Sequence, residues 1–464
     1  MLNDIKFKKE FWLLNLIQML ERLAYASVIL QMAVYIAQKD IPGGLHWEHS
    51  TKGWIFFIWA IIQNLTPVIL GGLSDRLGRK KILSFAIIIS SIGFICLGFF
   101  RDLIGFTLAT VVLGFGLGLF KPTLQAYISQ YMNNDEKSIG WSINIMLINL
   151  SVFFAPLFSN IMHSISWFWV FFGSGILILL NLILLFLIKE INVSIEKENT
   201  NNLFKDLFLE LKNPKILLFL LIMVGFTTLY MQFYETLPNY IYDWINSNHL
   251  IEKLNLPEFL LSTNNFGKII DFKWLYNINS GLIIIFIVPI SFLLKKRKFS
   301  LAIIIGLSLV TIGLFLSGGF NLIEITFIGM GIYTFGEMII NPKIIEFMSK
   351  IGNENKRALY LGLINISFGL GLAIGSLLGG YIYKHFGEKS SLAQKYLYTY
   401  FPNELNINHS NALNRLMELK NIDFIEATKL LYNYYHPNLI WIPFLIIGLI
   451  SIVFFYLYKK RYNI

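Results

Sequence analysis

The chain has 464 residues, of which 55% are hydrophobic and 14% charged, and its formal net charge is +10. A soluble protein carries about a quarter charged residues, so the composition excludes a soluble globular domain and predicts a membrane protein. The basic excess does not predict nucleic-acid binding, because the lysines and arginines stand in short segments between apolar stretches.

Twelve apolar stretches are long enough for a helix to cross the roughly 30 Å hydrocarbon core of a bilayer. We therefore expect an all-α membrane protein with twelve transmembrane helices. The first stretch is too long for the apolar part of a signal peptide, so no cleavable signal is expected. In chain order, the predicted spans are 11–37, 53–73, 82–100, 103–131, 138–163, 166–188, 215–246, 274–294, 299–319, 321–349, 357–385 and 437–458.

The distribution of basic residues predicts the orientation of these spans. If the N-terminus is cytoplasmic, that side of the membrane holds 23 of the 38 Lys and Arg residues. The four short loops on the other side hold only Lys39, Lys52 and Arg101. Because basic residues are retained on the cytoplasmic side, we expect both termini on the cytoplasmic side of the cell membrane.

A long polar segment at 189–214 separates six spans from six. This division predicts an N-terminal six-helix bundle over 1–188, a cytoplasmic linker over 189–214 and a C-terminal six-helix bundle over 215–464. A shift of 220 residues also places FKPTLQAYISQYMNNDEKS, from Phe120, over INPKIIEFMSKIGNENKRA, from Ile340. Parallel repeats of six spans are typical of transporters, although prolines recur in unrelated membrane helices too.

Two polar insertions, 247–272 and 386–436, are expected on the outer side of the C-terminal half. The second contains NALNRLMELKNIDFIEATKLLYNYY, whose apolar residues recur at helical spacing and predict an amphipathic helix. An outer cap is one interpretation, and a membrane-surface helix or a partner-binding element is the other.

The turn after the second predicted span reads GGLSDRLGRKK, from Gly71 to Lys81. Its glycines allow close approach of two helices, and Asp75 suits the N-terminus of a neighbouring helix. By itself the string is also compatible with an ordinary basic cytoplasmic loop. It resembles the loop motif of the major facilitator superfamily, which implies transport by rocking of two six-helix bundles. The resemblance makes Gly71, Asp75, Arg76, Gly78 and Arg79 candidate residues of a conformational gating loop.

Four of the charged residues inside predicted spans stand out: Glu21, Arg22, Lys121 and Glu337. A charge at the bilayer centre costs about 2.5–3.5 kcal/mol on insertion scales, so such side chains usually face a protein interior or a watery cavity. Two acids and two bases can neutralise one another around a central site. A purely structural network of ion pairs is the alternative.

Four strings resemble motifs of the proton-dependent oligopeptide transporter family: ERLAY, GLFKP, INIMLINLSVFFAPL and YTFGEMIINP. The resemblance implies that Glu21 accepts the coupling proton and pairs with Lys121, and that Arg22 binds the solute's anionic end. Glu337 would bind the cationic end. The implied proton-coupling group is Glu21, Arg22 and Lys121, and the implied solute contacts are Arg22, Tyr25, Lys121, Asn149 and Glu337.

Several positions depart from that family's pattern. Gln18 stands where the first glutamate of its motif would be, and the other departures are Leu23, Ala26, Ile29, Asn64 and Ile145. One titratable carboxylate and one mobile counter-ion are enough for a proton switch, so coupling is expected to survive these changes. The departures fall on solute contacts, so the solute could differ from a peptide.

The sequence thus predicts a secondary transporter, not an enzyme, that imports a small polar or zwitterionic solute by proton symport, with di- and tripeptides as first candidates. An uncoupled facilitator or an exporter of drugs or metabolites is the alternative, and a receptor or scaffold that uses 386–436 is a more remote one. The seven histidines show no metal-ligand spacing, and no cofactor is expected beyond the proton gradient. We expect a monomer in the lipid bilayer.

Overall fold

The computed structural model describes residues 7–39, 41–70, 74, 77–132, 137–188, 209–295, 298–351, 357–401 and 407–463. The described residues are mainly helical, and eleven of their helices are long and apolar enough to cross a membrane. A shorter apolar segment, Phe272–Ile287, lies in a twelfth helix at the position of the eighth predicted span.

The membrane helices follow the predicted spans closely. In the first half they are α1 (Lys9–Ala37), α2 (His49–Leu70), α4 (Arg79–Phe99), α5 (Leu103–Gln130), α6 (Lys137–His163) and α7 (Trp167–Leu179), which α8 (Asn181–Phe186) continues. In the second half they are α10 (Pro214–Trp244), α12 (Phe272–Lys295), α13 (Phe299–Gly319), α14 (Ile323–Ile351), α15 (Arg357–Ile382) and α19 (Trp441–Tyr462).

Local sequence signals set several of the helix starts. The side chain of Asp102 accepts a hydrogen bond from the backbone N–H of Gly105 at the start of α5. Asn213 does the same for Lys215 at the start of α10, where Pro214 takes the first helical position. Both arrangements satisfy backbone N–H groups that a helix leaves free at its first turn.

Small residues bring neighbouring helices into close contact. A Cβ atom on Gly116 of α5 would lie 2.4 Å from Ser90 Oγ of α4. A Cβ atom on Gly53 of α2 would lie 2.6 Å from the carbonyl oxygen of Ser376 on α15. Glycine is therefore required at both crossings, as is typical of packed membrane helices.

Most helix packing joins helices of the same half of the chain, for example α4 with α5 and α13 with α14. Across the halves, α2 packs on α15, α6 on α12 and α1 on α10. The division into two six-helix bundles stays a prediction. Of the predicted linker 189–214, residues 189–208 lie outside the described part of the chain.

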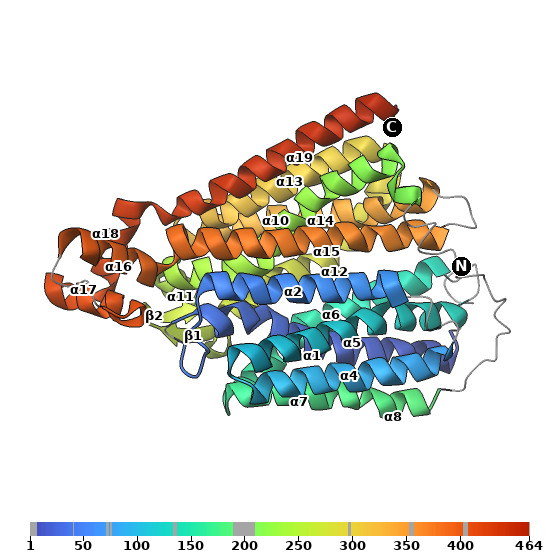
Figure 1. Ribbon diagram of the computed structural model, residues 1–464, viewed down its shortest axis with the longest axis horizontal. Coiled ribbons are helices and arrows are strands. Elements are labelled where there is room, and N and C mark those ends of the chain that lie inside the picture. The colour runs from blue at the N-terminus through green and yellow to red at the C-terminus, as the bar shows by residue number, and fades with distance from the viewer. Residues whose placement is uncertain are drawn as a thin grey trace.

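The two insertions form one compact unit, which we call the cap. It contains α11 (Asn248–Leu254), the antiparallel strands β1 (Leu261–Asn264) and β2 (Gly267–Ile270), α16 (Lys389–Tyr400), α17 (Ala412–Lys420) and α18 (Phe424–Tyr435). Figure 1 shows the cap at one end of the long helices, whereas α1 begins and α19 finishes at the other end. We call the first of these the cap end.

The predicted single amphipathic helix in the second insertion is two helices. Asn421 adopts a left-handed conformation, with φ of 50°, and closes α17, and Asp423 with Glu426 forms a capping box that starts α18. The apolar sides of both helices are buried within the protein at Ala412, Leu416 and Leu431. The cap therefore uses these faces for its own packing.

The ammonium of Lys389 joins the parts of the cap to the membrane helices. Its Nζ lies 4.3 Å from the ring centre of Phe424, 4.6 Å from that of Phe266 and 5.2 Å from that of Trp244. These rings belong to α18, to the turn between β1 and β2, and to the last residue of α10. Cation–π attraction at a buried ammonium of this kind is worth about 2 kcal/mol.

Candidate functional site

Glu21 and Arg22 form a close ion pair in the middle of α1. Arg22 Nε donates to Glu21 Oε2 and Arg22 Nη2 donates to Glu21 Oε1, both over 2.6 Å. The Glu21 side chain is almost fully buried, and 16% of the Arg22 side chain is exposed. The guanidinium carbon also lies 4.6 Å from the ring centre of Tyr25, one turn further along α1. Carboxylate, guanidinium and phenol thus form one unit on one face of α1.

Lys121 lies on α5, directly before Pro122, and is exposed although the helix is a membrane helix. Its ammonium group interacts electrostatically with both Arg22 and Glu21. The expected ion pair between Glu21 and Lys121 is not formed in this conformation, since no carboxylate of the described residues lies within 4.0 Å of Lys121 Nζ. Glu21 uses both oxygens on its chain neighbour Arg22 instead.

Glu337 is buried on α14 in the second half of the chain. Asn279 Nδ2 of α12 donates to its Oε2 over 2.9 Å, and Asn341 Nδ2 donates to its Oε1 over 3.3 Å. Asn279 also donates to Thr334 Oγ1 over 3.0 Å. The carboxylate is therefore oriented by amide donors, and the described residues provide no cation within 4.0 Å of it.

Tyr230 of α10 connects the two groups of charges. Electrostatic interactions reach from its hydroxyl to Arg22 and Tyr25 in the first half and to Glu337 in the second. Its ring centre lies 4.9 Å from that of Tyr234. Tyr230 was not among the residues singled out from the sequence. Two tyrosines one helical turn apart inside a predicted span were the available signal.

Asn149 and Gln18 have different surroundings from those of the charged group. Asn149 donates to the carbonyl oxygen of Ile145 on its own helix, α6. Gln18 is buried, and its Oε1 accepts a hydrogen bond of 2.8 Å from Asn144 of α6, which also donates to Asn15 of α1. Gln18, at the position where the oligopeptide transporter motif has its first glutamate, is thus a neutral amide that connects α1 to α6.

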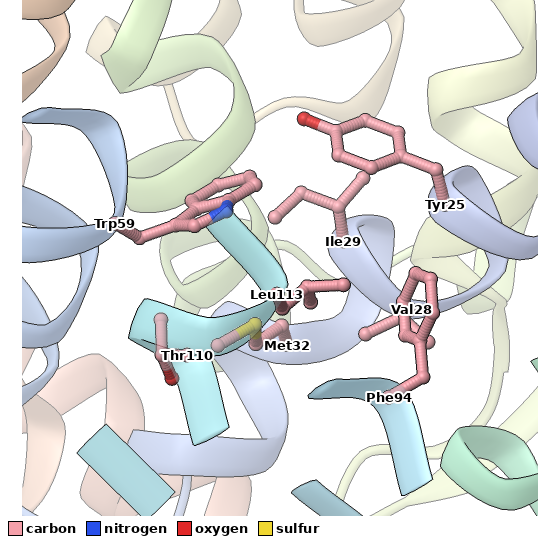
Figure 2. Close-up of a pocket in the computed structure, with 8 residues that line it drawn as sticks. All are labelled: Tyr25, Val28, Ile29, Met32, Trp59, Phe94, Thr110 and Leu113. Atoms are coloured by element: carbon pink, nitrogen blue, oxygen red, sulfur yellow. The ribbon is translucent and has the colours of Figure 1, made fainter. Parts of the chain in front are cut away.

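A small cavity of about 10 Å³ lies beside Tyr25, the residue that contacts Arg22. Figure 2 shows Tyr25 and Trp59 on one side of it and mainly apolar side chains on the others. Its lining is Tyr25, Val28, Ile29, Met32, Trp59, Phe94, Thr110 and Leu113. This volume holds at most about one water molecule, so it is not a solute site.

The predicted gating loop is described only in part. Gly71, Asp75 and Arg76 lie outside the described residues. Gly78 has a φ of 96°, a conformation that favours glycine, and it precedes the first residue of α4. Arg79 Nη1 donates to the carbonyl oxygen of Ala126 over 2.9 Å, which ties the start of α4 to α5.

A second buried ion pair joins the two halves nearer the cap. We expected Lys52 in an outer loop, but the structure places it in the first turn of α2, where its side chain is fully buried. Its Nζ lies 3.5 Å from Oε1 of Glu235 on α10, whose side chain is also fully buried. Glu235 lies within the seventh predicted span and was overlooked in the sequence. Lys52 is buried where α2 packs closely on α15, next to the Gly53–Ser376 contact, and where Glu235 of α10 faces it.

Comparison with known proteins gives the family of this chain. The model of the Major Facilitator Superfamily matches residues 14–350 and 245–400. The chain belongs to the Major Facilitator Superfamily. It is therefore an integral multi-pass membrane protein and a transporter rather than an enzyme.

Curated relatives of this member of the superfamily are distant. An uncharacterized transporter, YclF of Bacillus subtilis (strain 168), is 26% identical over 42% of this chain and 39% of its own length, so this match covers well under half of the relative. A Na(+), Li(+), K(+)/H(+) antiporter of Planococcus maritimus is 22% identical over 75% of this chain and 83% of its own length.

Solved structures share the fold of this chain. The nucleoside transporter NupG matches with a TM-score of 0.69 at 13% identity, covering 98% of this chain and 100% of the other. A peptide transporter POT in complex with sulfate matches with a TM-score of 0.68 at 15% identity, covering 96% and 94%. At these identities the likeness concerns the fold and not the solute.

Proposed function

We propose that this superfamily member is a proton-coupled symporter of a small polar or zwitterionic solute, with di- and tripeptides as first candidates. The observation that carries the proposal is the position of Tyr230, which interacts electrostatically with Arg22 of the first half and Glu337 of the second. Arg22 and Glu337, which carry opposite charges, are thus both within electrostatic range of Tyr230. A solute with a carboxylate and an ammonium group matches this charge order.

In this proposal Arg22 and Lys121 bind the carboxylate of the solute, and Glu337 binds its ammonium group. Glu337 is suited to this role because it is held by amide donors and keeps its negative charge free for a ligand. The ring of Tyr25 holds the Arg22 guanidinium in place by a cation–π contact. Lys121 is exposed and has no carboxylate partner among the described residues, so it is proposed to be available to an incoming anion.

Coupling to protons follows from the Glu21–Arg22 pair. When a solute carboxylate takes over Arg22, Glu21 loses both hydrogen bonds in a buried position. An isolated buried carboxylate is costly, so Glu21 then takes up a proton or pairs with Lys121. Solute binding and proton binding thereby favour each other, which is the requirement for symport.

Alternating access is proposed to operate through the contacts between the halves at the cap end. Besides Lys52–Glu235, the amide of Gln38 donates to Asp243, and Lys273 Nζ donates to Asn160 Oδ1 over 2.6 Å. These contacts close the cap end in the present conformation. If the cap end is the outer one, as the positive-inside rule predicts, these contacts would close the transporter toward the outside.

The test is solute-driven proton movement in liposomes. The purified protein is reconstituted with a pH-sensitive dye inside, a membrane potential is imposed, and a panel of dipeptides, amino acids, sugars and nitrate is added outside. We expect dipeptides to acidify the interior, and we expect Glu21→Gln and Lys121→Ala to abolish this signal. Acidification by a different solute would keep the coupling and reject the peptide.

Antiport is the second candidate, because a relative named as a cation/proton antiporter matches three quarters of the chain. In that case the same ion pairs would exchange a proton for a cationic or drug-like solute moving outward. With solute loaded inside the liposomes, the direction of the pH change separates the two functions. Antiport would acidify the interior as the solute leaves, because each proton enters in exchange, whereas symport would make it more alkaline.

A further inference from the structure

A line of polar and titratable side chains runs from the cap to the buried Lys52–Glu235 pair. It consists of His409, Ser391 and Glu388 of the cap, His49 and Lys52 of α2, and Glu235 of α10, and we call it the cap relay. It alternates between the halves of the chain, because α2 belongs to the first half and the other residues to the second.

The surface end of the cap relay is a hydrogen-bonded triad. His409 retains 29% of its side-chain exposure, whereas Glu388 retains 4%. The Ser391 hydroxyl donates to Glu388 Oε2 over 2.8 Å and lies 2.7 Å from His409 Nε2. His409 Nε2 is also 3.4 Å from Glu388 Oε2. A group in contact with water is thus connected to a buried carboxylate.

The next link crosses from one half of the chain to the other. Glu388 Oε1 lies 3.9 Å from His49 Nε2, and the His49 side chain is 1% exposed. Glu388 Oε1 and His49 Nδ1 have no hydrogen-bond partner among the described residues. An imidazole with one nitrogen toward a carboxylate and the other free can accept a proton on one side and release it on the other.

The inner end is the ion pair between Lys52 and Glu235. Lys52 follows His49 by one turn of α2, and the two side chains interact electrostatically. Lys52 Nζ is 3.5 Å from Glu235 Oε1, and both side chains are fully buried. Neither carboxylate oxygen of Glu235 has a hydrogen-bond partner among the described residues.

These unpartnered atoms separate the cap relay from an ordinary structural network. Buried polar groups kept only for stability are nearly always hydrogen-bonded, because each unpartnered one costs about 1–3 kcal/mol. Here acceptors on Glu388 and Glu235 and a ring nitrogen of His49 are left open along one line. Successive proton transfer requires that each acceptor is open when the proton arrives and that its donor lies within reach, directly or through one water molecule.

We propose that the cap relay is a proton-entry route that delivers protons from the cap surface to Glu235. The proposal rests on the proposed proton coupling and adds the route by which protons enter. It also gives the insertion at 386–436 a function, since His409, Ser391 and Glu388 all belong to it.

Each transfer conserves protons and charge. Hydronium protonates His409, which passes a proton to Glu388, and Glu388 passes it to Nε2 of neutral His49. Lys52 gives one of its protons to the Glu235 carboxylate, and the imidazolium of His49 restores the Lys52 ammonium from its other nitrogen. The net result is a neutral Glu235, with the Lys52–Glu235 attraction removed. His49 is left with its proton on Nε2 instead of Nδ1, and a return of this proton to Nδ1 resets the relay.

Other charged groups face the relay and set its electrostatic field. Lys39 and Lys52 act on Glu388, and Tyr383 lies beside it. Lys39 and Lys52 also act on His49, as does His409. Asp243 acts on Lys52 from α10. Burial lowers the pKa of Lys39, which lies outside the membrane helices.

The experiment follows protonation of Glu235 directly and needs no solute. The full chain in lipid nanodiscs is exposed to a jump from alkaline to acidic pH, and the carboxylic acid band that is lost in Glu235→Gln is followed by time-resolved infrared spectroscopy. We expect Glu388→Gln to slow the appearance of this band by about tenfold or more, with the same final amplitude. His49→Gln provides a second variant with the same expected slowing.

Glu48→Gln is the matched control, because it makes the same chemical change at the same end of the molecule. Glu48 is exposed and bonded to Lys384 over 2.6 Å, off the relay, so its variant should protonate Glu235 at the original rate. Unchanged rates in both Glu388→Gln and His49→Gln would overturn the proposal, as would a reduced final amplitude in both, which indicates a structural role. Since this readout uses no solute, it fails or succeeds separately from symport.

Discussion

The guanidinium of Arg22 and the carboxylate of its chain neighbour Glu21 face each other through two hydrogen bonds of 2.6 Å in the middle of α1. Adjacent residues on a helix normally point in directions about 100° apart, so this pair forms only because both side chains fold back toward each other. In the part of the chain that the structure describes, this arrangement leaves Lys121 without a carboxylate within 4.0 Å. A solute anion can therefore enter next to a free cation and compete for Arg22.

Replacement of Arg22 by lysine should impair transport strongly. Lysine keeps the charge but cannot make the two parallel hydrogen bonds or the flat contact with Tyr25. We expect a KM for the solute at least about tenfold higher, which corresponds to about 1.4 kcal/mol. Uptake in proteoliposomes gives the value. Arg101→Lys is the control, since Arg101 lies away from this group and donates to the carbonyl oxygens of Gly43 and Gly44. An equal loss in that variant would contradict the assignment.

Replacement of Glu337 by glutamine should affect only solutes with a free ammonium group. The amide keeps the volume and part of the hydrogen bonding to Asn279, but it loses the charge that a cation needs. Since hydrogen bonds to charged groups are worth about 1.5–3 kcal/mol, we expect binding of a dipeptide to weaken by about 10- to 100-fold. Binding of its N-acetylated form should change little. Similar losses for both forms, measured by calorimetry, would show that Glu337 does not contact the ammonium group.

The effects of replacing Lys52 and Glu235 on the free energy of unfolding should depend strongly on each other. Removal of one partner leaves a buried charge without compensation, so Lys52→Met and Glu235→Gln should each cost about 3–5 kcal/mol in the free energy of unfolding. The double variant Lys52→Met/Glu235→Gln should recover most of this loss. Unfolding in detergent, compared across the four proteins of the cycle, measures the coupling. Additive losses would mean that the two side chains act independently.

Loss of the Lys389 ammonium should loosen the cap. Lys389→Ala removes three cation–π contacts and is expected to cost about 2 kcal/mol, whereas Lys389→Arg should retain much of the stability. Limited proteolysis within the cap reports the change as faster cleavage. Lys429→Ala on the exposed face of α18 is the matched control. Equal cleavage rates in Lys389→Ala and Lys429→Ala would reject a role of Lys389 in holding the cap.

Much of the helical architecture could be predicted from the sequence because bilayer thickness imposes a minimum length of apolar helix. The charged residues inside spans were visible for the same reason, since each interrupts an apolar run. Lys52 was misplaced because it precedes the apolar run of α2, and only the packing of α10 and α15 shows that it is buried. The break at Asn421 was readable locally, since Asn before an Asp-x-x-Glu string is a typical end and start of helices.

The partners of buried charges could not be read from the sequence. The resemblance to the oligopeptide transporter family implied that Glu21 pairs with Lys121, but both Glu21 oxygens accept hydrogen bonds from Arg22. His49 and Glu388 are 339 positions apart in the chain, and no periodicity connects them. Contacts of this kind depend on the tertiary arrangement of the halves.

Solute-driven acidification in liposomes is the direct test of proton symport by this protein. With an imposed membrane potential and dialanine added outside, the account predicts that wild-type protein acidifies the interior and that Glu21→Gln does not, although Glu21→Gln still exchanges labelled dialanine across the membrane. Transport of a solute by the wild type with no change in internal pH, or with alkalinisation on its entry, would contradict proton symport.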